Sequence, residues 1–112
     1  MSELANQSCV PCTGGVPRLD RGSIDGLLAQ LDGWAVERGH HLTKTFSFPD
    51  FRSALAAVVA IGAIAEAQAH HPDLYLAWGV VRVDLWTHKI DGLTESDFVF
   101  AAKVDRALAS AT

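Results

Sequence analysis

The chain has 112 residues, of which 13 are acidic and 9 basic, and its formal net charge is -4. This length fits one domain, and a chain so short buries only a modest share of its surface unless it associates with another. The acidic balance argues against direct nucleic-acid binding, because that requires clustered lysine and arginine side chains.

The sequence indicates neither a secretory leader nor a membrane span. Residues 1–8 are mostly polar and lack the apolar segment of a signal peptide. The longest apolar run, residues 54–65, has 12 residues, whereas a helix needs about 20 to cross a bilayer. We therefore expect a cytoplasmic protein that has no membrane partner.

Residues 1–22 are predicted to be a flexible N-terminal arm, ahead of a domain over residues 23–112. The arm contains several Pro and Gly residues and shows no hydrophobic periodicity. It carries Cys9 and Cys12, whereas a zinc ribbon needs a second pair of thiolates and the chain has only these two cysteines. We expect two reduced thiols; half of a metal site shared between subunits is the alternative.

Ser23 is predicted to cap a short helix that ends near residues 32–33. Two strands follow over residues 34–38 and 41–48, and the turn at Gly39 between them predicts a hairpin. The second strand alternates between apolar and polar residues, except that Lys44 falls on its apolar side. The two histidines at positions 40 and 41 are expected to be solvated hairpin residues.

A long helix is predicted from Pro49, a residue favoured at the first helical position, to about Ala69. It is apolar on nearly every side, whereas a surface helix shows a single apolar stripe. In so short a chain, a partner subunit is the more plausible cover. We therefore predict a homodimer or a homotetramer.

The remaining elements are two strands, over residues 74–78 and 80–87 with a bend at Gly79, and a last helix that ends near residue 109. The spacing of Thr94 and Asp97 is typical of a capping box at the start of that helix. The order is α-β-β-α-β-β-α. Paired hairpins predict an α+β fold, with a four-stranded antiparallel sheet and three helices on one face.

The five histidines fall in three places, at residues 40–41, at residues 70–71 and at residue 88. Imidazole is the side chain whose ordinary pKa lies near neutrality, so it suits proton transfer at physiological pH. Three of the five lie at the end of a predicted helix and at the end of a predicted strand. Such ends can meet where a sheet closes.

The spacing of these histidines resembles the pattern of the pterin-4a-carbinolamine dehydratases. Glu66 is followed by Ala-Gln-Ala and then by His70-His71-Pro72, and aromatic residues stand at positions 75 and 78. His88 comes 18 residues after His70, and Asp97 comes nine residues later. The resemblance covers roughly residues 23–109. A His-His-Pro sequence alone would be weak, but the spaced set is specific.

The resemblance implies an enzyme that removes water from a 4a-hydroxytetrahydropterin to give quinonoid dihydropterin, in the recycling of tetrahydrobiopterin. It implies no metal and no organic cofactor. His70 and His88 are the implied acid–base pair. The implied substrate-binding residues are His71, Asp97, Tyr75 and Trp78. Members of the family assemble as dimers, or as tetramers built from dimers.

Simpler interpretations exist for single residues. His70 and His71 could end a helix through its dipole, and Asp97 could be a cap alone. Trp86 stands where the family more often has a small residue, so its ring would narrow a pocket or pack against a partner subunit.

The alternative function is a non-catalytic binding or assembly protein on the same fold. Animal relatives act as dimerisation cofactors of a transcription factor, and some bacterial relatives assist Rubisco assembly. The latter tend to lose the active-site histidines, and this chain keeps all three, which favours the enzyme. A metal protein built on the histidine pairs lacks suitably spaced carboxylates.

Overall fold

The computed structural model describes residues 4–7 and 18–109. Cys9 and Cys12 lie outside these residues, so the expectation of two reduced thiols stays a prediction, as does the boundary between arm and domain. The elements follow one another in this order: η1 (Leu4–Asn6), α1 (Arg21–Leu28), β1 (Ala35–Glu37), β2 (His41–Ser47), α2 (Phe51–Gln68), β3 (Asp73–Ala77), β4 (Val80–Leu85), η2 (His88–Ile90) and α3 (Glu95–Ala109).

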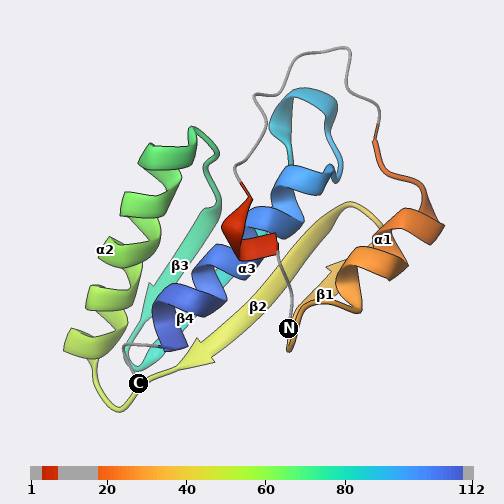
Figure 1. Ribbon diagram of the computed structural model, residues 1–112. Helices are drawn as coiled ribbons and strands as arrows, with labels where there is room; N and C mark the ends of the chain where they lie inside the picture. Colours follow the sequence, from red (N-terminus) through yellow and green to blue (C-terminus); the bar gives the residue numbers. More distant parts are fainter. Residues whose placement is uncertain (1–3, 8–17, 110–112) are drawn as a thin grey trace.

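The four strands form one antiparallel sheet in the order β1-β2-β4-β3. The side chains of β4 alternate, so that Val81, Val83 and Leu85 are fully buried toward the helices. Leu42 of β2 lies opposite Leu85 and is equally buried. All three α-helices lie on this face of the sheet (Figure 1). The predicted α+β fold and element order are confirmed.

The third helix, α3, supplies much of the core. Phe98, Phe100 and Val104 are fully buried, and α3 packs against α2 and α1. Residues 4–6 also dock on α3, where Leu4 is buried and Lys103 Nζ donates a hydrogen bond to the carbonyl oxygen of Ala5.

Two helices begin after an N-cap aspartate that the sequence pattern did not predict, Asp20 for α1 and Asp50 for α2. Asp20, not Ser23, caps α1, because its Oδ1 accepts a hydrogen bond of 2.7 Å from the backbone N–H of Ser23. Asp50 caps α2 in the same way through Ser53, so that helix starts after Pro49 rather than at it. An aspartate side chain reaches the N–H three residues later, and the ionised group also opposes the helix dipole.

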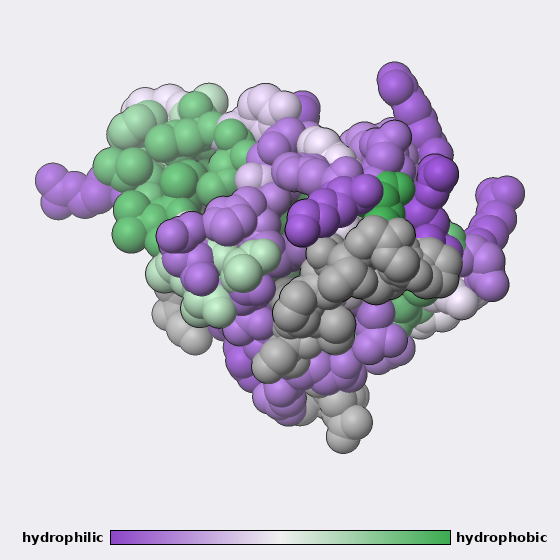
Figure 2. Space-filling view, turned by 90° about the horizontal axis from the view of Figure 1, so that it is seen from above, coloured by the Kyte–Doolittle hydropathy of each residue, from purple (hydrophilic) through white to green (hydrophobic). Residues whose placement is uncertain are grey.

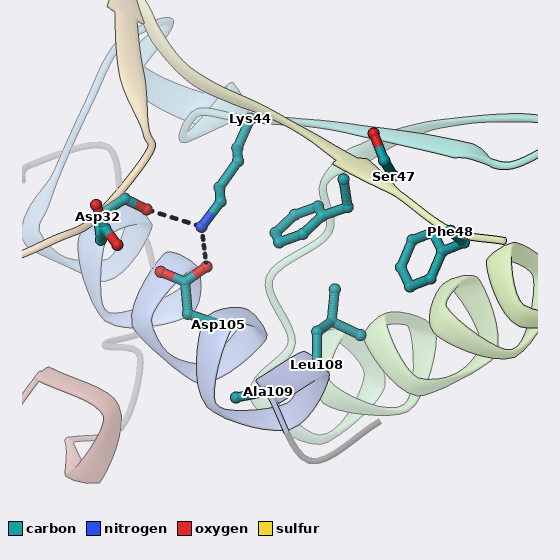
Figure 3. Close-up of a pocket in the computed structure, with 8 residues that line it drawn as sticks. Asp32, Lys44, Ser47, Phe48, Asp105, Leu108 and Ala109 are labelled. Carbon is teal, nitrogen blue, oxygen red and sulfur yellow. Dashed lines mark hydrogen bonds and ion pairs between the residues drawn. The ribbon is translucent and has the colours of Figure 1, made fainter. Parts of the chain in front are cut away.

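Lys44 occupies an apolar face because its charge is paired there. Its Nζ donates to Asp105 Oδ1 at 2.8 Å and to the carbonyl oxygen of Asp32 at 2.7 Å (Figure 3). The ammonium also lies 4.8 Å from the centre of the Phe46 ring, a favourable cation–π contact. The indole N–H of Trp34 donates to the other oxygen of Asp105.

The second helix, α2, buries one face and leaves another open. Its small residues Ala54 and Ala57, with Ile61, pack inward. Phe51, Leu55 and Val59 are exposed on another face of the helix. A green patch lies on the side of the molecule where α2 is found (Figure 2). By length and composition alone, α2 is also apolar enough to cross a membrane, with a mean hydropathy of 1.3 over 18 residues. A helix with one face in a core and another against a protein partner has the same composition.

Candidate functional site

The end of α2 turns the chain so that His70 enters the protein. Ala69 adopts a left-handed conformation with φ of 53°, and the backbone N–H groups of Ala69 and His70 both donate to the carbonyl oxygen of Ala65. This is the hydrogen-bonded reversal that commonly ends a helix. His70 is 7% exposed, and its ring lies 5.7 Å from the ring of Phe100.

Asp97 is the buried partner of His70. His70 Nε2 lies 2.6 Å from Asp97 Oδ1, and Asp97 is fully buried. The second oxygen, Oδ2, accepts from the hydroxyl of Thr87 and from the backbone N–H of Thr94, each at 2.9 Å. The Thr94 hydroxyl in turn lies 2.9 Å from that of Thr87. A buried carboxylate is tolerated only with such a full set of donors.

The predicted capping box is therefore half present. The side chain of Asp97 reaches back to the N–H of Thr94, but the Thr94 hydroxyl bonds Thr87 instead of the helix. Asp97 caps the first turn of α3 and bonds His70 at the same time. The roles of cap and site residue, which the sequence left as alternatives, are compatible in one side chain.

His88 reaches the same region because β4 ends early. The strand was predicted to reach Thr87, but it stops at Leu85, and Thr87 forms an isolated bridge with Gly92. His88 then opens the 3-10 helix η2. Strand alternation would place His88 on the polar face with Arg82 and Asp84. The change to a 3-10 turn removes that constraint.

His71 is paired with Glu66, which the sequence analysis left without a role. His71 Nε2 lies 2.6 Å from Glu66 Oε2, and both side chains are exposed. The two residues lie on either side of the left-handed turn at Ala69. Such an exposed pair adds little to stability, but it restricts the orientation of the imidazole.

The three histidines share one hollow. A cavity of about 340 Å³ is lined by Ala69, His70, His71, Trp86, Thr87, His88 and Lys89. The elements that build it meet at the end of the molecule that is uppermost in Figure 1, where α2 ends and α3 begins. Residues 18 positions apart in the sequence are thus brought to one site.

The structure does not bring the two predicted aromatic residues to this hollow. Tyr75 lies on the open face of the sheet, half exposed, with the Arg82 guanidinium 4.2 Å from its ring centre. Trp78 is in the turn that joins β3 to β4. This turn is at the end of the β3–β4 hairpin opposite to the histidine cavity, and Trp78 is 71% exposed there. Within one chain, therefore, neither residue lines the histidine cavity.

The hairpin histidines are not simply solvated, which corrects the expectation for them. His40 and His41 are both half-buried, and their rings lie 5.3 Å and 5.9 Å from that of Trp86. His40 Nε2 also lies 2.7 Å from Asp91 Oδ1. This hydrogen bond is the main cause that lowers the pKa of Asp91, followed by the charges of His40 and Arg18. No sequence spacing links positions 40 and 86, so only the folded sheet could reveal the contact.

A second hollow, of about 330 Å³, lies between β2 and the end of α3 (Figure 3). Two of its polar groups, Lys44 and Asp105, are already paired with each other, and no histidine lines it. The histidine cavity is therefore better suited to proton transfer. Within residues 4–7 and 18–109, no three His, Cys, Asp or Glu side chains are grouped so as to hold a metal ion.

Comparison with known proteins shows which family the chain resembles. The model of the family described as pterin 4 alpha carbinolamine dehydratase matches residues 17–107. The chain belongs to this family. A protein of Rubrobacter xylanophilus, provisionally named as such a dehydratase, is 57% identical over 106 residues, which is 95% of this chain and 99% of that one. A Rickettsia bellii protein with the same provisional name is 50% identical over 103 residues, or 91% of each chain.

Two solved structures of dehydratase-like proteins share the fold. The transcriptional coactivator/pterin dehydratase of Brucella melitensis superposes with a TM-score of 0.76 at 34% identity, over 80% of this chain and 97% of that one. A pterin dehydratase-like protein identified as a RuBisCO assembly factor in the alpha-carboxysome gives a TM-score of 0.58 at 25% identity, over 67% and 88%. The fold thus carries more than one kind of activity among its relatives.

Proposed function

We propose that the protein is a 4a-hydroxytetrahydropterin dehydratase that works by histidine acid–base catalysis. The observation that carries the proposal is the convergence of His70, His71 and His88 on one cavity, with His70 bonded to the buried Asp97. Membership of the dehydratase family supports the reaction class.

The reaction needs two proton transfers and no redox step. The bond between C4a and the hydroxyl oxygen breaks, and that oxygen takes up a proton and leaves as water. The N5–H bond also breaks: its proton is removed, and the electron pair left on N5 forms the double bond between N5 and C4a of the quinonoid product. A positioned acid and a positioned base each contribute about 10²- to 10⁴-fold to such a step.

His70 is the stronger candidate for the base. The Asp97 carboxylate accepts the Nε2 proton of His70, so Nδ1 is the ring nitrogen outside that bond. A carboxylate in this position fixes the tautomer of the imidazole and stabilises the imidazolium that forms when it takes a proton. His70 would then remove the N5 proton of the substrate.

His88 is the candidate for the acid, since it lines the same cavity and is exposed to solvent that can reprotonate it. His71, held by Glu66, would bind and orient the pterin. Tyr75 and Trp78 were also predicted to bind the substrate. They would do so only if a second subunit supplied them to the cavity or if the cavity extended as far as these residues. The proposed compartment is the cytoplasm, and the pterin would serve tetrahydrobiopterin recycling.

The first test is an assay of the purified protein with synthetic 4a-hydroxytetrahydropterin, following the formation of quinonoid dihydropterin. His70→Ala and His88→Ala should each lower kcat by about 10²-fold or more while the fold persists, as checked by near-ultraviolet circular dichroism. A wild type no faster than buffer would rule out the enzyme.

The second candidate is a binding or assembly role. The exposed apolar residues Phe51, Leu55 and Val59, here called the α2 stripe, favour it, because exposed apolar patches mark protein contacts. The relative identified as a RuBisCO assembly factor gives the precedent for such a role on this fold. A protein that forms a stable complex through α2 with a partner other than itself, and lacks dehydratase activity, would favour this reading.

A further inference from the structure

Trp86 is the large aromatic residue of the histidine cavity. It follows the last residue of β4, its side chain is half-buried, and it lines the cavity with His70, His71 and His88. The other described lining residues are an alanine, a threonine and a lysine. The cavity therefore has one extended flat hydrophobic side chain among polar and small ones.

The indole ring is held on several sides. The ring centre of His88 lies 4.5 Å from that of Trp86, and those of His40 and His41 lie 5.3 Å and 5.9 Å away. His40 is fixed in turn by Asp91 at 2.7 Å, and its Nδ1 lies 3.1 Å from that of His41. The hairpin of β1 and β2 thus contacts Trp86 through His40 and His41, and Trp86 in turn contacts His88.

A ring fixed in this way is pre-organised to stack on a flat ligand, because little rotational freedom remains to be lost on binding. A pterin is a planar bicyclic heteroaromatic ring whose faces are apolar and whose edge carries hydrogen-bonding groups. Aromatic side chains stack on such rings whatever the pattern of groups on the edge, as they do on nucleobases.

We infer that Trp86 is the aromatic wall of the pterin site and the residue that positions His88, with His40, itself held by Asp91, supporting the indole ring. This inference rests on the proposed function. In that function, Trp86 supplies both the surface that selects a flat bicyclic ring and the contact that holds the catalytic acid in place. Trp86 thereby joins the hairpin of β1 and β2 to the chemistry.

The test measures binding of 7,8-dihydrobiopterin, a stable pterin that cannot be dehydrated, by isothermal titration calorimetry, beside turnover of the hydroxylated substrate. Trp86→Phe and Trp86→Leu form a matched pair, because both keep apolar bulk and only phenylalanine keeps a flat ring. We expect the leucine variant to raise Kd about tenfold or more and the phenylalanine variant to stay within about threefold of wild type.

Loss of the contact with His88 adds an effect on kcat. Trp86→Leu should therefore lower kcat as well as raise KM, whereas a residue that only filled space would leave kcat unchanged in a folded variant. If both variants bind and turn over like wild type, the inference is wrong while the dehydratase stands. If wild-type protein binds no pterin at all, both the inference and the proposed function fail.

Discussion

Asp97 accepts hydrogen bonds from three donors, which come from three separate parts of the chain. His70 follows α2, Thr87 follows β4, and Thr94 precedes α3. One carboxylate therefore joins the end of a helix, the end of a strand and the start of another helix at the cavity. The stability of this region and the orientation of the His70 ring depend on the same group.

Replacing Asp97 by asparagine should separate the two roles. The amide oxygen can still accept from Thr87 and Thr94, but the amide nitrogen then faces His70 Nε2. The amide nitrogen can only donate, so Nε2 of His70 must become the acceptor. The ring proton then moves to Nδ1, and His70 can no longer act as the base. We expect kcat to fall about 10²-fold or more with a small change in unfolding free energy.

Asp97→Ala should lose activity and also unfold more easily, by about 2–3 kcal/mol, because it leaves buried donors without a partner. The matched control is Glu95→Gln, which removes an exposed carboxylate in the same helical turn. Turnover and urea denaturation of the three variants check this. An asparagine variant as active as wild type would remove Asp97 from the mechanism.

Among the elements, those with a local sequence pattern were predictable. Alternation in β2 and β4 and the capping pair of Thr94 and Asp97 gave the right elements within a few residues. The exceptions lack such a pattern. The left-handed turn at Ala69 has no glycine to announce it, and the contact of His40 with Trp86 depends on strand register.

The same limit applies to the candidate site. Motif spacing indicated that His70, His71 and His88 could meet, because they lie at the ends of elements, and the three residues do line one cavity. It could not place Tyr75 or Trp78 relative to that cavity, since the β3–β4 hairpin carries them away from its open end. Nor could it show that the Thr87 hydroxyl donates a hydrogen bond to Asp97, because a buried hydroxyl produces no periodic pattern in the sequence.

The cap of α2 makes the stability of this element dependent on pH. The backbone hydrogen bond from Ser53 is the main cause that lowers the pKa of Asp50 below its ordinary value of 3.8. A group whose pKa is lower in the folded state stabilises the protein above the unfolded pKa. That stabilisation is lost as the pH falls through the folded pKa.

Asp50→Ser should remove this dependence, since a hydroxyl caps a helix without ionising. At pH 7 the variant should unfold at the same or slightly lower urea concentration than wild type. Between about pH 5 and pH 3 the wild-type midpoint should fall further than that of the variant. Parallel midpoints over this range would show that the Asp50 carboxylate does not contribute.

On the scale of the whole molecule, α2 exposes an apolar surface to solvent. Phe51, Leu55 and Val59 are 44%, 44% and 65% exposed and recur every four residues, so they share one face of α2. A chain of 112 residues gains much from covering such a face. The predicted homodimer or homotetramer would cover it with the same face of a second copy, since a two-fold interface uses the same self-complementary surface on both subunits.

Charged substitutions on this face test the assembly. Val59→Glu places a carboxylate at the most exposed position of the stripe, where a folded monomer tolerates it but a packed interface does not. We expect wild type to sediment as a dimer or tetramer in analytical ultracentrifugation and Val59→Glu to shift toward monomer. The control is Ala56→Glu, which adds the same charge at an exposed residue of α2 beside the stripe rather than in it. A wild type that is monomeric at every concentration would refute the assembly and leave the α2 stripe as a surface for a different protein.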